Sequence, residues 1–175
     1  MLLWILIMAA SIILDQITKL IVVNTMTLAE TIPLIEKVFS FTRVHNYGAA
    51  WGMLSNHRWI FIAVTALAII ILPIFLYKYR KLHFLFGFSL SLIIGGAVGN
   101  MIDRVFLGYV IDFLQFTFID FPVFNVADIC VTCGAALMFI YLAFIDKTLF
   151  AETPKKKKEE STNDGTNENH SDKHE

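Results

Sequence analysis

Cysteine is scarce in this sequence: Cys130 and Cys133 are the only two among 175 residues. Two cysteines cannot provide the framework of a disulfide-rich fold. Their spacing of one helical turn would suit a redox pair or a pair of metal ligands, but free cysteine often serves as a small buried apolar residue. We therefore interpret both as packing residues.

Net charge is also nearly absent. The formal net charge is −1 at pH 7, so the whole chain has no strong field that would attract nucleic acid. No lysine or arginine precedes the first apolar run, and Asp15 and Lys19 interrupt its second half. A cleavable secretory signal begins with basic residues and has an uninterrupted apolar core. We therefore expect this first segment to be retained.

Apolar residues, by contrast, are abundant: 57% of the chain is hydrophobic, and the mean hydropathy is +0.65. Four segments reach the roughly 20 residues needed to cross a bilayer, namely residues 2–23, 59–77, 84–107 and 123–144. The sequence thus predicts an all-α membrane protein with four transmembrane helices within residues 1–150. Residues 151–175 are polar and charged, and we expect a disordered tail there.

Basic residues indicate the orientation, because cytoplasmic loops carry an excess of lysine and arginine. One side would hold eight of them and the other side four, so both termini are predicted to be cytoplasmic. The eight are Lys78, Arg80, Lys81, Lys147 and Lys155 to Lys158, and the four are Lys37, Arg43, Arg58 and Arg104.

Two connections between the spans have distinct patterns. Residues 38–44 are rich in aromatic and β-branched residues, which predicts a strand, and the turn residues 46–48 follow it. We expect a small β element on the outer surface, with Trp51 and Trp59 as interfacial anchors, although an irregular loop fits the propensities equally well. Residues 107–122 are aromatic but too short for a further crossing, so we expect an interfacial lid or re-entrant segment there.

Polar residues occur inside or beside the spans. Asp15 and Lys19 are four residues apart on one helix face and can pair, and we favour a structural ion pair. Gly95 and Gly99 are spaced for close helix contact, and Asn100, Asp103 and Arg104 follow within about one turn. An interfacial polar cap explains this second group as well as a binding site does.

Asp112 and Asp128 are the sharpest candidates for catalysis. Asp112 follows the third span, and Asp128 lies near the start of the fourth, three residues after Asn125. Two close carboxylates would share a proton, so that one could activate water while the other protonates a leaving group. The structural alternative is helix capping by Asp128 or Asn125 and a solvated Asp112.

Five motifs in this order resemble prolipoprotein signal peptidase (signal peptidase II), a family of bacterial membrane aspartic endopeptidases that is the target of the antibiotic globomycin. The resemblance covers nearly all of residues 1–150. The motifs read DQITK at 15–19, NYGAAW at 46–51, GAVGNMIDR at 96–104, VIDF at 110–113 and FNVAD at 124–128.

This resemblance implies four transmembrane helices with an extracytoplasmic β-cradle and an interfacial helix or loop, in the bacterial cell membrane. It implies cleavage of diacylglyceryl-modified prolipoproteins just before the lipidated cysteine, with membrane lipid as a further partner and with no metal, other cofactor or nucleic acid. We expect a monomer. The implied catalytic pair is Asp112 and Asp128. The implied substrate-binding or supporting residues are Asp15, Lys19, Asn46, Gly48, Asn100, Asp103, Arg104, Asn125 and Ala127.

Two other functions fit the composition. A small transporter or channel would line an ion path across the membrane with the same ionisable residues. A non-catalytic adaptor would recruit partners through the lysine-rich tail. The clustering of polar residues towards one side of the membrane favours the peptidase.

Overall fold

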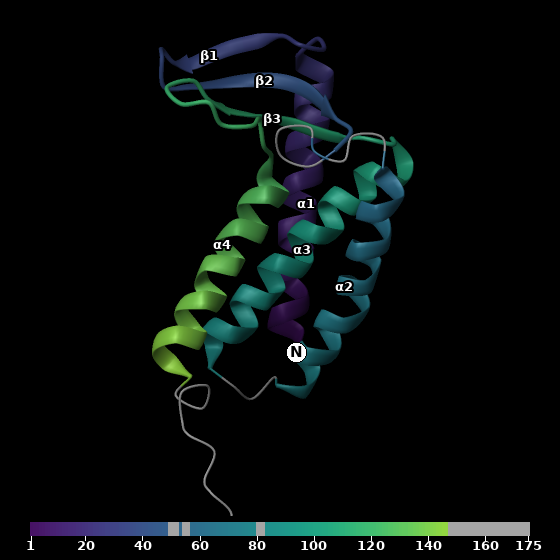
Figure 1. Ribbon diagram of the computed structural model, residues 1–175, viewed down its shortest axis with the longest axis vertical. Helices are drawn as coiled ribbons and strands as arrows, with labels where there is room; N and C mark the ends of the chain where they lie inside the picture. The colour runs from purple at the N-terminus through teal and green to yellow at the C-terminus, as the bar shows by residue number, and fades with distance from the viewer. Residues whose placement is uncertain (49–52, 54–56, 80–82, 147–175) are drawn as a thin grey trace, which may run out of the picture.

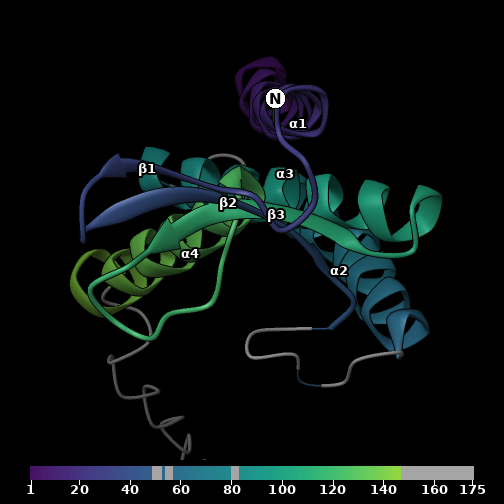
Figure 2. The same cartoon turned by 90° about the horizontal axis from the view of Figure 1, so that it is seen from above.

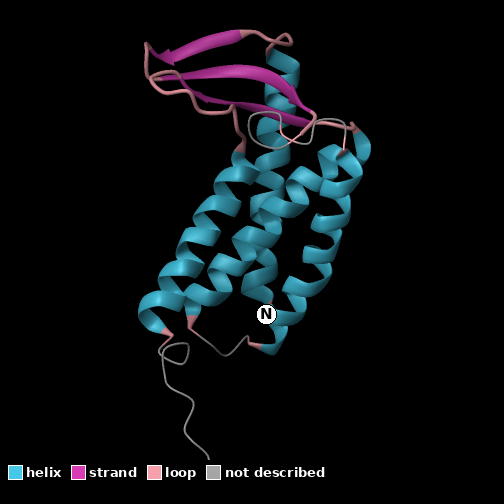
Figure 3. Ribbon diagram, viewed as in Figure 1, coloured by secondary structure: helices cyan, strands magenta, loops and turns pink. Residues whose placement is uncertain are grey.

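The computed structural model describes residues 1–48, 53, 57–79 and 83–146. Their element order is α1 (Leu2–Thr25), β1 (Thr31–Ile35), β2 (Phe39–Asn46), α2 (Arg58–Lys78), α3 (Phe84–Phe106), β3 (Val110–Phe116) and α4 (Val126–Ile140), with a π-helical turn at Tyr141–Ile145. The helices form a bundle, and the strands form a small sheet at one end of it (Figures 1 and 3). The described residues do not include residues 49–51 of the second motif, among them Trp51, or the 151–175 tail.

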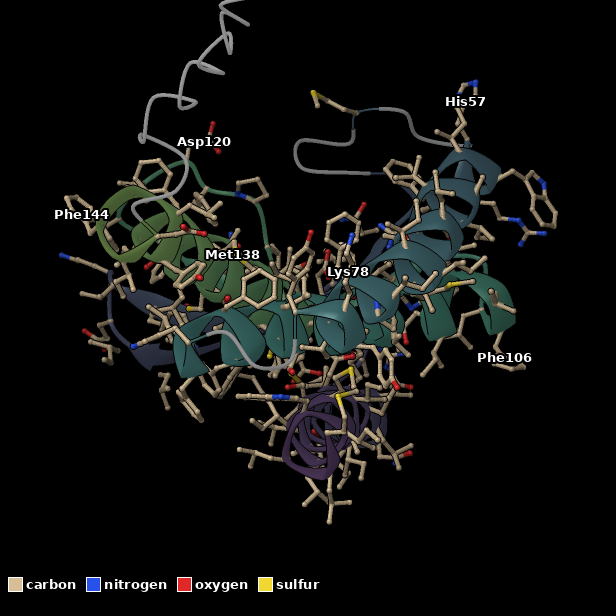
Figure 4. All side chains as sticks on the ribbon, turned by 90° about the horizontal axis from the view of Figure 1, so that it is seen from below. His57, Lys78, Phe106, Asp120, Met138 and Phe144 are labelled. Carbon is tan, nitrogen blue, oxygen red and sulfur yellow. The ribbon has the colours of Figure 1, made fainter. Side chains whose placement is uncertain are left out.

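Four helices in the described part of the chain are long and apolar enough to cross a membrane, which confirms the four predicted spans within three residues at each end. They form because each is an almost unbroken apolar run. Only 6% of the most apolar stretch of α2 is buried inside the protein. Phe106 and Phe144, 80% and 74% exposed, point away from the bundle (Figure 4). Such outward apolar side chains are typical of helices solvated by lipid.

Helix α3 is the centre of the bundle and contacts α1, α2 and α4. Its glycines permit this, because side chains there would collide with the neighbouring helices. A Cβ on Gly95 would lie 2.8 Å from the Cβ of Ser11 in α1, and one on Gly96 would overlap the carbonyl oxygen of Ala127 in α4. The predicted close helix contact at Gly95 and Gly99 is therefore confirmed within one chain, with α1 as the partner of both.

The sheet is antiparallel, with strand order β1-β2-β3. The predicted strand over residues 38–44 is confirmed as β2, which Figure 2 shows lying between β1 and β3 across the end of the bundle. Phe113 and Leu114 of β3 are buried against Val22 and Met26 at the end of α1. This contact fixes the sheet to the helices.

The expectation of a lid or re-entrant segment at residues 107–122 was wrong for its central part. Residues 110–116 form β3, which pairs with β2 so that Asp112 lies opposite Val44 and Val110 lies opposite Asn46. The first five residues of β3 are buried on both faces. A strand buried on both faces has no polar and apolar alternation, and this run was therefore indistinguishable from an interfacial segment.

Helix α4 begins at Val126, three residues later than predicted, because Asn125 is its N-cap. The Asn125 side chain accepts a hydrogen bond from the Asp128 amide, and the Asp128 side chain accepts one from the Asn125 amide. This reciprocal capping box confirms the capping role that the sequence suggested for both residues. It also fixes the position of the Asp128 carboxylate.

Candidate active site

Asp112 and Asp128 line one cavity at the sheet end of the bundle. Asp112 lies in the middle of β3 and is 2% exposed, whereas Asp128 is half-buried in the first turn of α4. The cavity has a volume of about 360 Å³, and Asn46, Asn100 and Arg104 also line it. The aromatic and apolar wall consists of Val110, Phe121, Pro122, Val123 and Phe124.

Asparagine amides orient both carboxylates. The Asp112 oxygens accept hydrogen bonds from Asn46 Nδ2 at 2.8 Å and from Asn125 Nδ2 at 2.6 Å. The Asp128 oxygens accept from Asn100 Nδ2 at 2.7 Å and from the Asn125 backbone amide at 3.1 Å. Asn125 thus donates to both aspartates and holds them on either side of itself. Both carboxylates are placed by donors that carry no charge.

The pKa of Asp112 is raised from 3.8 to about 7, first by burial and second by the negative charge of Asp128. The hydrogen bonds from Asn46 and Asn125 and the charge of Lys19 oppose this rise but do not cancel it. A carboxyl group with such a pKa keeps its proton up to near-neutral pH. The two aspartates therefore interact electrostatically, as a pair sharing one proton would.

A buried ion cluster lies beneath the pair. Lys19 Nζ is 2.8 Å from Asp15 Oδ2 and 2.9 Å from Asp103 Oδ2, and all three side chains are at most 3% exposed. The structural Asp15–Lys19 ion pair predicted from the sequence is thus confirmed. Lys19 Nζ also donates to Asn100 Oδ1 at 3.0 Å, and the amide of Asn100 in turn binds Asp128.

The same cluster anchors the backbone beside each aspartate. Asp15 Oδ1 accepts from the amide of Ala127 at 2.9 Å, and Asp103 Oδ2 accepts from the amide of Ile111 at 3.1 Å. Ala127 and Ile111 each immediately precede one aspartate of the pair. Lys19 therefore joins two anchors, and through them it sets where β3 and α4 present Asp112 and Asp128.

Gln16 is part of this cluster, although the sequence analysis did not predict an individual role for it. Its Nε2 lies 3.1 Å from Asp15 Oδ2, 3.1 Å from Asp103 Oδ1 and 3.2 Å from the Gly99 carbonyl oxygen. A glutamine amide can satisfy oxygens that the single lysine leaves free. Its place next to Asp15 in the chain was the only signal available.

Arg104 lies at the edge of the cavity. Its guanidinium donates to the Gly48 carbonyl oxygen at 3.2 Å and lies 4.8 Å from the centre of the Phe61 ring. Gly48 also donates its amide to Asn46 Oδ1 at 2.9 Å. These contacts connect the end of β2 to α3 and place a cation beside the two carboxylates.

Every site residue predicted from the sequence thus belongs to one connected network, including Ala127, which is fully buried. The packing interpretation of the cysteines holds only in part, because Cys130 is half-buried and Cys133 is exposed. Within the described residues, no group of three or more His, Cys, Asp and Glu side chains is arranged to hold a metal ion. The network can perform acid–base chemistry on a water molecule and can donate hydrogen bonds to a bound peptide.

The chain is similar to known membrane enzymes in both sequence and fold. The family described as signal peptidase (SPase) II matches residues 7–144. A relative from Brevibacillus brevis, named lipoprotein signal peptidase, is 49% identical over 138 residues, or 78% of this chain and 93% of the relative. One of the same name from Clostridioides difficile is 44% identical over 144 residues, or 82% of this chain and 97% of the relative. A solved structure described as a bacterial membrane enzyme matches with a TM-score of 0.78 and 36% identity, over 86% of this chain and 92% of that chain.

Proposed function

The chain belongs to the signal peptidase II family, and from this premise we propose that Asp112 and Asp128 are its catalytic residues. The protein is a multi-pass membrane protease that removes signal peptides from prolipoproteins. It cleaves before the diacylglyceryl-modified cysteine, as its family does. The observation that carries the catalytic proposal is the pair of carboxylates, both bound by Asn125, on one 360 Å³ cavity.

The pair hydrolyses the peptide bond with one proton between its two carboxyl groups. The ionised aspartate takes a proton from a water molecule as the water oxygen attacks the scissile carbonyl carbon. The protonated aspartate hydrogen-bonds the carbonyl oxygen and then gives its proton to the leaving amine. The raised pKa of Asp112, about 7, supports a pair that holds one proton at neutral pH.

The remaining polar groups of the cavity bind and orient the peptide. Arg104 and the amides of Asn46 and Asn100 can donate hydrogen bonds to substrate carbonyl oxygens, since all three line the cavity. Donors that are already held in place stabilise the developing oxyanion without reorganising. Lys19, Asp15 and Asp103 act as positioning residues and do not contact the substrate.

The positions of the site and the N-terminus at opposite ends of the bundle support an orientation in the membrane. The site lies at the sheet end, and the N-terminus lies at the opposite end of the bundle (Figure 1). With both termini in the cytoplasm, the site lies near the extracytoplasmic surface. The substrate's signal helix and acyl chains would confine its scissile bond to that depth, which raises its local concentration at the site. One chain contains the complete cavity, which supports a monomer.

The transporter alternative requires a polar route across the whole membrane. Among the described residues, the buried charged side chains are Asp15, Lys19, Asp103 and Asp112. They form the single network described above, and residues 2–14 of α1 contain no charged residue at all. This distribution supports a site near one membrane surface. An ion path would need further polar residues in the other half of the membrane.

Purified protein in detergent and a diacylglyceryl-modified prolipoprotein test the function directly. Mass spectrometry of the products should show cleavage before the lipidated cysteine, with the same prolipoprotein lacking lipid cut far more slowly. The Asp112→Asn/Asp128→Asn double variant controls for contaminating proteases. A folded wild-type protein that leaves a competent substrate intact would overturn the proposal.

A further inference from the structure

A second cavity adjoins the one that holds the aspartate pair. Its volume is about 430 Å³, and it shares Phe121, Phe124 and Asp128 with the first. It lies between the β3 strand and α4, where Leu114 and Cys133 also line it. Because the two cavities share these residues, they lie side by side, and Asp128 faces both of them.

The second cavity is an apolar groove that follows α4 into the membrane span. Asp128 is the only charged residue in its lining, and Phe121 and Phe124 form one wall with ring centres 5.7 Å apart. From Asp128 the lining continues along α4 to Thr132 and Cys133. At 1.5 Å per residue, Cys133 lies about 7.5 Å further along the helix axis than Asp128.

We propose that this groove binds one acyl chain of the substrate's diacylglyceryl group. The inference rests on the proposed function, since the lipid is attached to the residue that follows the scissile bond. A peptide bond held at Asp128 would place that lipidated side chain at the mouth of the groove. The apolar wall then removes the chain from water, at a gain of roughly 0.8 kcal/mol per buried methylene.

The size of the groove argues against the signal helix as its occupant. An α-helix is at least about 10 Å wide with its side chains, and one turn of it fills roughly 420 Å³. A single turn would therefore take up the whole groove of about 430 Å³. An extended acyl chain is much thinner and can follow the groove along α4.

Cys133→Trp tests the assignment, because an indole there would fill the far end of the groove. The matched control is Ile140→Trp, which adds the same ring at an exposed position two turns further along the same helix face. For a dipalmitoyl substrate, Cys133→Trp should raise KM about tenfold or more, the effect of displacing about two buried methylenes. For a dibutyryl substrate, and for Ile140→Trp with either substrate, KM should change less than twofold.

Thiol labelling provides a second readout that does not require turnover. In an Asp112→Asn/Cys130→Ala protein, Cys133 is the sole cysteine, and N-ethylmaleimide should label it. The dipalmitoyl prolipoprotein should slow this labelling at least fivefold, whereas unlipidated prolipoprotein or phospholipid vesicles alone should not. In the matched Asp112→Asn/Cys133→Ala protein, the labelling rate of Cys130 should not depend on the substrate.

The outcomes separate the groove from the proposed function. If wild-type protein leaves the dipalmitoyl substrate uncut, the proposed function fails. If it cuts that substrate, equal KM values for Cys133→Trp and Ile140→Trp overturn the groove alone. Protection of Cys133 by unlipidated prolipoprotein would assign the groove to the signal peptide, and equal protection by vesicles would assign it to membrane lipid. Either result contradicts the proposal.

Discussion

Lys19 is the residue on which the site depends most, although it lies outside the cavity that holds the aspartates. It is 2% exposed and is the only cation within 4 Å of Asp15 and Asp103 in the described structure. Burying three charged groups is costly unless each is paired and hydrogen-bonded. The cluster meets that condition, because Asp15 also accepts a hydrogen bond from the Ala127 amide of α4 and Asp103 accepts one from the Ile111 amide of β3. Its charges therefore hold both the helices and the site in place.

Replacing Lys19 by methionine should destabilise the protein by about 3–5 kcal/mol, because two buried carboxylates lose their counter-charge. Cleavage should also fall strongly, since the Ala127 and Ile111 anchors would shift. Unfolding in detergent measures the first effect. Thr18→Ala is the control, since within the described part of the chain the Thr18 hydroxyl bonds only to carbonyls of its own helix. This variant should change stability by less than about 0.5 kcal/mol. Equal stability of the two variants would contradict the role of Lys19.

The raised pKa of Asp112 predicts how activity depends on pH. As the pH rises through about 7, Asp112 loses its proton, and kcat/KM should fall because the pair no longer contains an acid. The ionised form is disfavoured in the fold, so this group lowers the free energy of unfolding as the pH rises from about 4 to about 7.

Asn46→Ala should move this alkaline limb to higher pH, because it removes a hydrogen bond that lowers the pKa of Asp112. The pH profile of kcat/KM measures the shift. Thr42→Ala, on the same strand but bonded to Gln115, should leave the limb in place. A limb that moves to lower pH in Asn46→Ala would refute the assignment of Asp112 to it.

At the scale of elements, the contact between α3 and α4 determines where Asp128 lies. Gly96, in the middle of α3, lies against the Ala127 carbonyl, and Gly134 of α4 lies against Ser89 and Ile93 in the N-terminal half of α3. A Cβ at Gly134 would be 2.8 Å from the Ser89 carbonyl oxygen. Both positions exclude a side chain, but of the two only Gly96 contacts Ala127, the residue that precedes Asp128.

Gly96→Ala and Gly134→Ala should therefore lower stability to a similar extent but differ in their effect on activity. Each should cost about 1–3 kcal/mol, the usual range for overpacking a close contact. Gly96→Ala should also lower kcat at least tenfold because it displaces the first turn of α4, whereas Gly134→Ala should leave kcat within about twofold. Thermal unfolding and steady-state kinetics provide the two readouts. Equal losses of kcat would show that the α3–α4 contact does not control the position of Asp128.

The elements also show what the sequence could and could not predict. The four spans, β2 and the residues of the site followed from apolar run length, strand composition and motif order. The strand β3 did not, because its first five residues are buried on both faces and lack alternation. The hydrogen bonds that join Asp15 to the Ala127 amide and Asp103 to the Ile111 amide could not be predicted either. The first spans 112 residues of sequence, and no local pattern specifies such a contact.

At the scale of the whole molecule, the two ends of the helix bundle differ in what they contain. The sheet lies at one end of the bundle and the N-terminus lies at the other (Figure 1). The aspartate pair and both cavities lie at the sheet end, where residues of β3 and of the start of α4 line the cavities. Lys78 is the basic residue in the last turn of α2, and α2 ends at the lower end of the bundle, opposite the sheet (Figure 1). From the distribution of basic residues, we propose that this lower end faces the cytoplasm.

Cysteine accessibility in spheroplasts tests this orientation. In a Cys130→Ala/Cys133→Ala background, a membrane-impermeant thiol reagent should label Leu28→Cys, which lies between α1 and β1 at a 55% exposed position. Lys78→Cys should react only after the membrane is permeabilised. The parent without cysteines controls for background labelling. The reverse pattern of labelling would mean that the site faces the cytoplasm.

The central claim is that Asp112 and Asp128 together carry out the hydrolysis, and single-turnover cleavage of a diacylglyceryl-modified prolipoprotein tests it most directly. Asp112→Asn and Asp128→Asn should each slow cleavage by about 10²- to 10⁴-fold, the range for a lost general acid or base, while the protein stays folded. Asp120→Asn, at an exposed position pointing away from the bundle (Figure 4), should cleave at the wild-type rate. Full activity in either single variant of the pair would contradict the account.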